Sequence, residues 1–284
     1  MNRQRPPSST GLPSDRADVG DSLRVVFQHH EAALGKAIDR LKGEPDVSVV
    51  LLGGSIAKGT ERPDSDVDLI VVVGDAAYAE RLSQNRVTFF WTDLANWPGG
   101  YVEGRFVSRS FVLAAAERGS EPTRWSFTGV RAVRGDDPEI LAAIPRIPVY
   151  PEADRERRMD AFMAQMVLYR RYFWPEGVRM GDPYLKTRSA TAIVLFGVRL
   201  ILAHNHLLFP NQKRLMETLA KCPSQPDGLV DLANKTLAGD EVAMHAFCDS
   251  VESSVGKRDA DLGSRFTLDS EMSWFFGSIE VAEW

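Results

Sequence analysis

Two short apolar runs, joined by a glycine turn and a polar loop, constrain the fold of this chain most strongly. Residues 47–52 read Val-Ser-Val-Val-Leu-Leu and end at Gly53-Gly54, and residues 66–73 read Asp-Val-Asp-Leu-Ile-Val-Val-Val. Short aliphatic runs rich in β-branched residues are typical of buried strands. The residues between them, 55–65, fit a brief helix followed by a loop. The sequence therefore predicts two buried strands that flank a tight turn.

The pattern of apolar residues changes along the chain at a proline-rich segment, residues 145–151. Before it, the spacing predicts strands and helices in alternation, with further strands at 87–91, 101–107 and 130–134 and helices at 21–42, 76–82 and 111–118. After it, helical signals dominate, at 154–173, 185–208, 212–220, 229–238 and 241–255. We expect a disordered leader at 1–20, an α/β (α+β) domain at 21–148 and an all-α helical domain at 149–284.

Composition supports an ordinary globular protein of two-domain size. The chain has 284 residues, of which 44% are hydrophobic and 26% are charged. The net charge is −5, from 34 basic and 39 acidic residues. Nucleic-acid binders normally carry a basic excess, so a nucleic-acid partner is disfavoured.

Localisation signals are sparse. The N-terminus begins basic but lacks the apolar run of a signal peptide. The longest apolar stretch, residues 192–202, is well short of the about 20 residues that span a bilayer, so we expect no membrane partner. Cys222 and Cys248 form no metal-type or redox pair. A reducing, cytoplasmic location fits best.

Two aspartates stand at the start of the second apolar run. Asp66 and Asp68 are two residues apart, so in a strand they project from the same face. Adjacent carboxylates repel and raise each other's pKa unless a cation neutralises them. Mg²⁺ is typically bound by one or two carboxylates together with substrate phosphates, so the pair is a candidate magnesium site. The alternative is a solvated turn in which Asp64 and Ser65 cap the loop.

The glycine turn before this pair favours the magnesium interpretation. Gly53 and Gly54 let a ligand approach the backbone closely. Ser55 follows, where its hydroxyl and the next amides can hold a phosphate. The turn and the carboxylates lie at the ends of strands joined by a short loop, so they can contact one triphosphate from two sides.

This stretch resembles the signature of the nucleotidyltransferase superfamily typified by DNA polymerase β: Gly-Gly-Ser, a short helix, then Asp-x-Asp on the next strand. Within that superfamily it looks most like the bacterial small-molecule adenylyltransferases, such as the aminoglycoside and lincosamide nucleotidyltransferases. The close match covers about residues 50–73. The resemblance implies a small mixed sheet in the N-terminal domain, with Gly54 and Ser55 at the β- and γ-phosphates and Asp66 and Asp68 as metal ligands.

The resemblance also implies a third carboxylate, as metal ligand or as base, for which Asp93, Glu103 and Glu117 are candidates. Glu103 lies in a predicted strand beside a glycine that leaves room for a ligand. We therefore take Glu103 as the third catalytic and metal-binding carboxylate, with Asp93 in reserve and Glu117 as a solvated helix residue. Superfamily members more often carry aspartate here. The alternative for Glu103 is an edge-strand residue paired with Arg105 or Arg109.

These parts imply a Mg²⁺-dependent nucleotidyltransferase that moves a nucleoside monophosphate, AMP from ATP or the equivalent from another NTP, to a hydroxyl of a small molecule such as an antibiotic, releasing pyrophosphate. A two-metal site is expected, in which a second Mg²⁺ or Glu103 activates the acceptor hydroxyl. The helical half would select the acceptor. The sequence indicates no oligomeric state.

Two other functions stay open. A protein-modifying adenylyltransferase of the antitoxin type would use the same motif with a protein side chain as acceptor, although those enzymes are usually smaller. A catalytically silent module would bind the nucleotide without turnover. The intact Ser55, Asp66 and Asp68 favour catalysis over silence.

Several weaker signals have both a functional and a structural interpretation. Lys58 is expected to contact phosphates, with a solvated loop cation as its alternative. Lys213 is assigned to the triphosphate because similar transferases place a lysine there. Residues 169–174 line an acceptor pocket or belong to the core. Glu121 and Arg124 are loop structure or acceptor contacts.

Overall fold

The computed structural model describes residues 27–44, 46–256, 258 and 261–276. The leader expected at 1–20 lies outside the described residues, as do the first residues of the helix expected at 21–42. The described part of that helix is α1 (Gln28–Leu41).

A five-stranded mixed sheet forms the N-terminal half. Its strands are β1 (Val47–Leu52), β2 (Val67–Val73), β3 (Thr88–Trp91), β4 (Val102–Ser108) and β5 (Arg131–Arg134), in the order β3-β4-β2-β1-β5. The pair β2 and β4 is parallel, and the other neighbours are antiparallel. All five strands occur where the apolar runs predicted them, with their ends shifted by no more than one residue.

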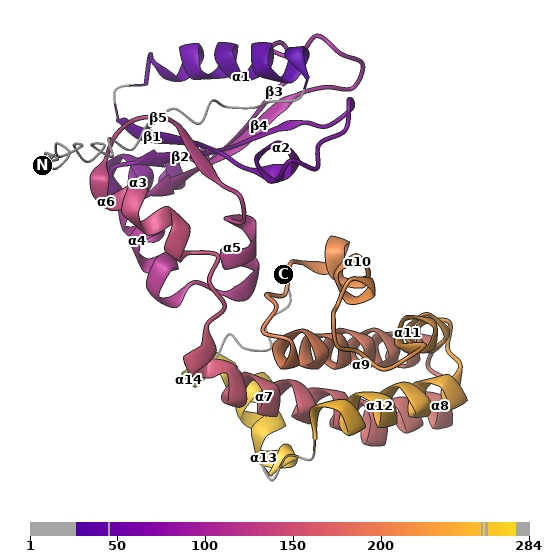
Figure 1. The fold of residues 1–284 in the computed structure, drawn as a ribbon. Helices are drawn as coiled ribbons and strands as arrows, with labels where there is room; N and C mark the ends of the chain where they lie inside the picture. The colour runs from indigo at the N-terminus through magenta and orange to yellow at the C-terminus, as the bar shows by residue number, and fades with distance from the viewer. Residues whose placement is uncertain (1–26, 45, 257, 259–260, 277–284) are drawn as a thin grey trace, which may run out of the picture.

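Helices cover both faces of this sheet (Figure 1), and strand alternation decides which side chains meet them. On β2, Val67, Leu69 and Val71 belong to the cluster under α1. Ile70 and Val72 belong to the opposite cluster, beneath α4 (Arg109–Arg118) and α6 (Pro138–Ala143). Two further short helices in this half are α2 (Gly54–Lys58) and α3 (Asp75–Ser83).

The C-terminal half is helical and has its own apolar core (Figure 1). Its α-helices are α7 (Arg155–Leu168), α8 (Trp174–Met180), α9 (Pro183–His204), α10 (Leu215–Ala220), α11 (Leu229–Leu237), α12 (Glu241–Val255), α13 (Leu262–Phe266) and α14 (Ser273–Phe276). Short 3-10 or π segments are η1 (Ile144–Arg146), η2 (Glu152–Asp154), η3 (Tyr169–Phe173), η4 (Gln212–Arg214) and η5 (Thr267–Glu271). The expected fold class, a mixed sheet followed by helices, is confirmed. No described helix combines the length and apolar character needed to cross a bilayer.

Several short helices are absent from the sequence prediction: α8, α13 and α14 in the helical half, and α5 (Glu121–Ser126) and α6 in the N-terminal half. The last two are each six residues long, too short to show a helical period. Each starts at a capping side chain, Ser120 for α5 and Asp137 for α6, with a proline in the first turn. The caps are the signal that could have revealed them.

A buried ion cluster joins α5 to the helical half. One carboxylate oxygen of Glu121 accepts a hydrogen bond from Arg158 Nη1 at 3.1 Å and the other accepts from the backbone amide of Phe209 at 2.8 Å. Arg199 Nη2 lies 3.8 Å from the same carboxylate. Arg124 donates to backbone carbonyls, including those of residues 147 and 149. These contacts hold the structure together and favour the structural interpretation of Glu121 and Arg124.

Candidate active site

The glycine turn after β1 is shaped to fit one carboxylate. Gly54 has φ +63°, and a Cβ atom there would lie 1.7 Å from Oδ2 of Asp68. The amide of Gly53 donates to the backbone carbonyl of Asp68 at 2.9 Å. A larger residue at position 54 would be strained and would also displace the carboxylate.

Three carboxylates converge beside this turn. Asp68 on β2 is the register partner of Glu103 on the parallel strand β4, so their side chains share a face. Asp66 immediately precedes β2. Each of the three half-buried residues offers one oxygen, and these oxygens lie within 4.8 Å of one another. We call Asp66, Asp68 and Glu103 the carboxylate triad.

Burial and repulsion among the three carboxylates shift the pKa of a triad residue. Burial, followed by the charges of Asp66 and Glu103 and a hydrogen bond to Glu103, raises the pKa of Asp68 from 3.8 to about 7. Tyr101 is hydrogen-bonded to Asp66, which, with some burial, raises the pKa of the tyrosine to about 12. Lys58 only partly offsets the effect on Asp68. Clustered hard oxygen donors with excess negative charge fit a divalent cation such as Mg²⁺.

The rival candidates for the third carboxylate lie elsewhere. Asp93 forms an exposed ion pair with Arg40 of α1. Glu117 is exposed on α4. The alternative in which Glu103 pairs on an edge strand is not seen, because β4 lies between β3 and β2 and Arg109 contacts Asp137 instead.

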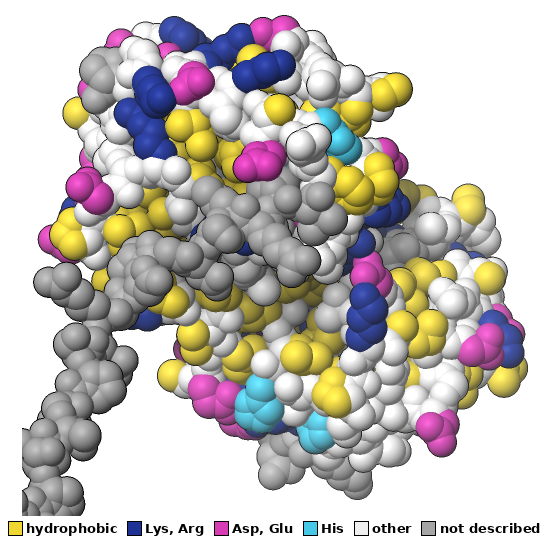
Figure 2. Space-filling model, turned by 45° about the horizontal axis from the view of Figure 1, so that its top comes forward, with side chains coloured by type: hydrophobic (Ala, Val, Ile, Leu, Met, Phe, Trp, Pro, Cys, Tyr) yellow, Lys and Arg dark blue, Asp and Glu magenta, His cyan; other side chains and the backbone are white. Residues whose placement is uncertain are grey.

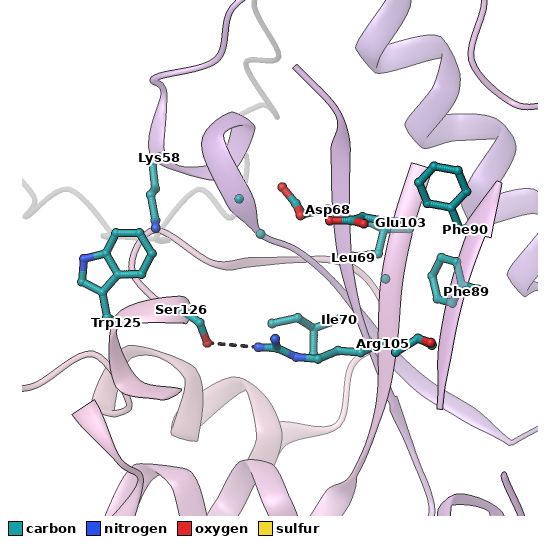
Figure 3. A pocket seen from close by; sticks show the side chains of 14 residues that line it. Lys58, Asp68, Leu69, Ile70, Phe89, Phe90, Glu103, Arg105, Trp125 and Ser126 are labelled. Carbon is teal, nitrogen blue, oxygen red and sulfur yellow. Dashed lines mark hydrogen bonds between the residues drawn. The ribbon is translucent and has the colours of Figure 1, made fainter. Parts of the chain in front are cut away.

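A cavity of about 690 Å³ opens beside the triad (Figure 3). Lys58 Nζ lies 3.3 Å from the ring centroid of Trp125, a cation–π contact across the cavity wall. Burial lowers the pKa of Lys58, and the nearby positive charge of Arg214 lowers it further, whereas Asp68 partly offsets both. The ammonium group of Lys58 is therefore partly buried and fixed against Trp125 at the pocket, and it is not a freely solvated loop cation.

The helical half contributes charge to this pocket through η4. Lys213, assigned to the triphosphate from the sequence, is exposed on η4. It is the following residue, Arg214, whose charge acts on Lys58. Arg214 also pairs with Glu217 at 2.6 Å. Ser55 is half-buried in α2, within the turn that borders the triad.

Other lining residues were not assigned from the sequence. Arg105, which lines the cavity, and Tyr101, which is hydrogen-bonded to Asp66 of the triad, share strand alternation with Glu103, and this is the signal that could have found them. Trp125 and Ser126 come from α5, and no pattern in the sequence places that helix at the triad.

Most of the aromatic cluster at residues 169–174 belongs to the helical core. Trp174 is fully buried. Tyr169 and Phe173 pack against each other with tilted rings, their centroids 4.9 Å apart, and both contact Phe266. Tyr172 alone is largely exposed. Neither described cavity is lined by these residues, so the core interpretation holds.

Comparison with known proteins agrees with the site. Residues 34–111, which contain the whole triad, match the nucleotidyltransferase domain family. This match confirms the resemblance inferred from the motif. No curated protein matches the chain in sequence.

Solved structures with partial similarity include two transferase-type chains. A nucleotidyltransferase-like protein from Exiguobacterium sibiricum is 13% identical, with a TM-score of 0.42, over 89% of this chain and 81% of that one. The spectinomycin adenyltransferase AAD(9) from Enterococcus faecialis, solved with ATP and spectinomycin, is 14% identical, with a TM-score of 0.31, over 83% of this chain and 95% of that one.

Proposed function

From the premise that this chain is a nucleotidyltransferase, with its nucleotidyltransferase domain at residues 34–111, we propose that it transfers AMP from ATP to a hydroxyl of a small molecule and releases pyrophosphate. The observation that carries the proposal is the convergence of Asp66, Asp68 and Glu103 beside the Gly53-Gly54 turn. Nucleotidyl transfer from a triphosphate, like phosphoryl transfer, needs mainly positioning and charge neutralisation, which these groups supply. The choice of ATP follows from the resemblance to adenylyltransferases.

Each group has a role that follows from its place. The carboxylate triad would hold Mg²⁺, which when bound neutralises charge on the nucleotide phosphates. The amides of Gly54 and Ser55 hold the β- and γ-phosphates. Lys58, fixed on Trp125, adds positive charge to the pocket that Gly53 and Gly54 also line.

Glu103 acts as the general base for the acceptor hydroxyl. It stands on β4, on the side of the triad nearest β3, and its carboxylate accepts the proton of the attacking hydroxyl. The hydroxyl oxygen forms a bond to the α-phosphorus in line with the bond that breaks to pyrophosphate. The helical half closes over the triphosphate through η4, where Arg214 adds to the positive charge near Lys58, beside the expected contact from Lys213.

A small acceptor suits the surface better than a nucleic acid does. On the face drawn in Figure 2, basic side chains lie in separate groups among acidic and hydrophobic ones. The net charge of −5 points the same way.

A labelling experiment tests this function. The protein is incubated with Mg²⁺, each of the four NTPs labelled at the α-phosphate, and pools of aminoglycosides, lincosamides and cell metabolites. We expect an adduct whose mass identifies both the nucleotide and the acceptor. The matched control is the D66A/D68A double variant, checked for folding by circular dichroism, which should form none.

The same experiment separates the alternatives. A silent module would bind ATP with Mg²⁺ and yield no pyrophosphate with any pool. A protein-modifying enzyme would label a polypeptide in a cell lysate in preference to a small molecule. Equal labelling by the wild type and the double variant would contradict the proposal.

A further inference from the structure

The pocket beyond the triad is basic and aromatic. On β4, Arg105 follows Glu103 by two residues, so both lie on the pocket face with Cα atoms about 7 Å apart. The neighbouring edge strand places Phe90 opposite Glu103 and Thr88 opposite Arg105. All four residues line the pocket, and Figure 3 shows Glu103 beside Asp68 and Arg105 further along the same strand.

Arg105 brings a positive charge to this pocket. Its Nη2 donates to the neutral hydroxyl of Ser126 at 3.0 Å, which orients the guanidinium across the pocket (Figure 3). Among the described residues, no acidic side chain forms an ion pair with Arg105. A guanidinium has five N–H donors in a planar fork that matches a carboxylate or a phosphate. The remaining donors are available to a ligand.

Phe90 supplies an apolar surface next to the reacting centre. Its ring is 58% exposed although it lines the pocket, and it packs on Tyr101 with centroids 4.4 Å apart. An exposed ring held in place by a second aromatic residue offers a rigid platform for a flat apolar face.

Charge decides which acceptor class fits this pocket. The carboxylate triad serves the metal, and the other charged residues that line the pocket, Lys58 and Arg105, are both basic. A polycationic acceptor would meet these cations and find no acidic partner among the other lining residues. An anionic acceptor would gain charge-assisted hydrogen bonds.

We propose, resting on the nucleotidyl transfer proposed above, that the acceptor is a small hydroxyl compound bearing a carboxylate or a phosphate. Arg105, oriented by Ser126, binds this anionic group, and Phe90 packs against the body of the acceptor. The acceptor hydroxyl then lies at Glu103, and its anionic group lies at the guanidinium of Arg105.

A charge-fractionated metabolite extract tests this assignment. The extract is separated at pH 7.5 into anionic, neutral and cationic fractions, and each is incubated with the protein, Mg²⁺ and the four α-labelled NTPs; kanamycin and spectinomycin form a separate cationic arm. We expect labelled product from the anionic fraction. Prior treatment of this fraction with phosphatase distinguishes the sources, since it abolishes the product of a phosphorylated acceptor and spares that of a carboxylate.

Substitutions of Arg105 then test whether this residue binds the anionic group of the acceptor. R105Q should lower kcat/KM for the acceptor found in the anionic fraction at least tenfold. R105K should restore part of this lost kcat/KM, and the exposed-site control R146Q should match the wild type. The KM for the nucleotide should stay unchanged in all three.

Three outcomes would overturn the inference. Product from only the neutral or cationic arms would refute the anionic acceptor while leaving nucleotidyl transfer intact. A tenfold rise in the nucleotide KM of R105Q would make Arg105 a nucleotide ligand. The absence of product from every arm would reject the proposed function, and the inference with it.

Discussion

The molecule contains two sets of carboxylates with opposite surroundings. Glu121 is buried at the junction of the two halves, where Arg158, Arg199 and the amide of Phe209 surround it. In the triad, Asp68 is surrounded by two further carboxylates, and its pKa rises to about 7. The first carboxylate is neutralised by the fold, and the second requires a partner from outside.

This difference separates structural from functional acid groups. A buried charge that stabilises a fold is paired within it. A cluster of like charges is destabilising unless a ligand compensates it, and such clusters are common at sites of chemistry. The short helix α5 links the two sets, because it carries Glu121 at one end and the pocket residues Trp125 and Ser126 at the other.

The largest expected effect is loss of activity from the triad. D66N and D68N should each reduce pyrophosphate release by about 10³-fold or more, since each removes a metal ligand, and this corresponds to about 4 kcal/mol of transition-state stabilisation. Single-turnover assays with Mg²⁺ and ATP measure it. Residual activity above one tenth of the wild-type rate would show that the triad is not the reaction centre.

Removal of the junction carboxylate should act on stability. E121A removes the hydrogen-bonded carboxylate of the buried guanidinium of Arg158, leaving only Asp154 at 3.9 Å, and should lower the free energy of unfolding by about 3–5 kcal/mol. Urea denaturation followed by circular dichroism measures this. A loss below about 1 kcal/mol would mean that the junction does not depend on the ion cluster.

In the triad the same kind of substitution should stabilise the metal-free protein. The pKa of Asp68 is raised from 3.8 to about 7, so between these pH values the folded state holds a proton that the unfolded state has lost. Wild-type stability therefore falls as pH rises through this window. D68N removes the repulsion and should be more stable than the wild type by about 4 kcal/mol at pH 8 and nearly equal to it at pH 4.

Urea titrations in EDTA at the two pH values check this prediction. A D68N variant that is less stable than the wild type at pH 8 would indicate that Asp68 is compensated within the protein, as Glu121 is.

The smallest effect is expected at Asp93, the reserve candidate. D93N breaks an exposed ion pair with Arg40 and should leave both stability and activity nearly unchanged. The matched substitution E103Q should reduce turnover at least 100-fold. Parallel pyrophosphate assays compare the two, and the reverse ranking would move the third carboxylate to Asp93.

Local sequence information was sufficient for the sheet and the triad. The apolar runs determined β1 and β2, and the resemblance called for a third carboxylate, for which Glu103 was chosen because it lies in a predicted strand beside a glycine. The register that sets Glu103 opposite Asp68 came only from the structure. The stacking of Lys58 on Trp125 and the approach of Arg214 to Lys58 were not predictable, because they depend on how distant segments pack. A six-residue helix such as α5 gives no periodic signal, and the partners of Glu121 lie far away in the sequence.

Divalent-cation binding tests the central claim most directly. Mn²⁺, an EPR-visible substitute for Mg²⁺, is titrated into the wild type, D66N/D68N and D93N in the presence of ATP. The account predicts ATP-dependent Mn²⁺ binding by the wild type and D93N and its loss in D66N/D68N. Equal Mn²⁺ binding by all three proteins would contradict the assignment of the carboxylate triad as the metal and nucleotide site.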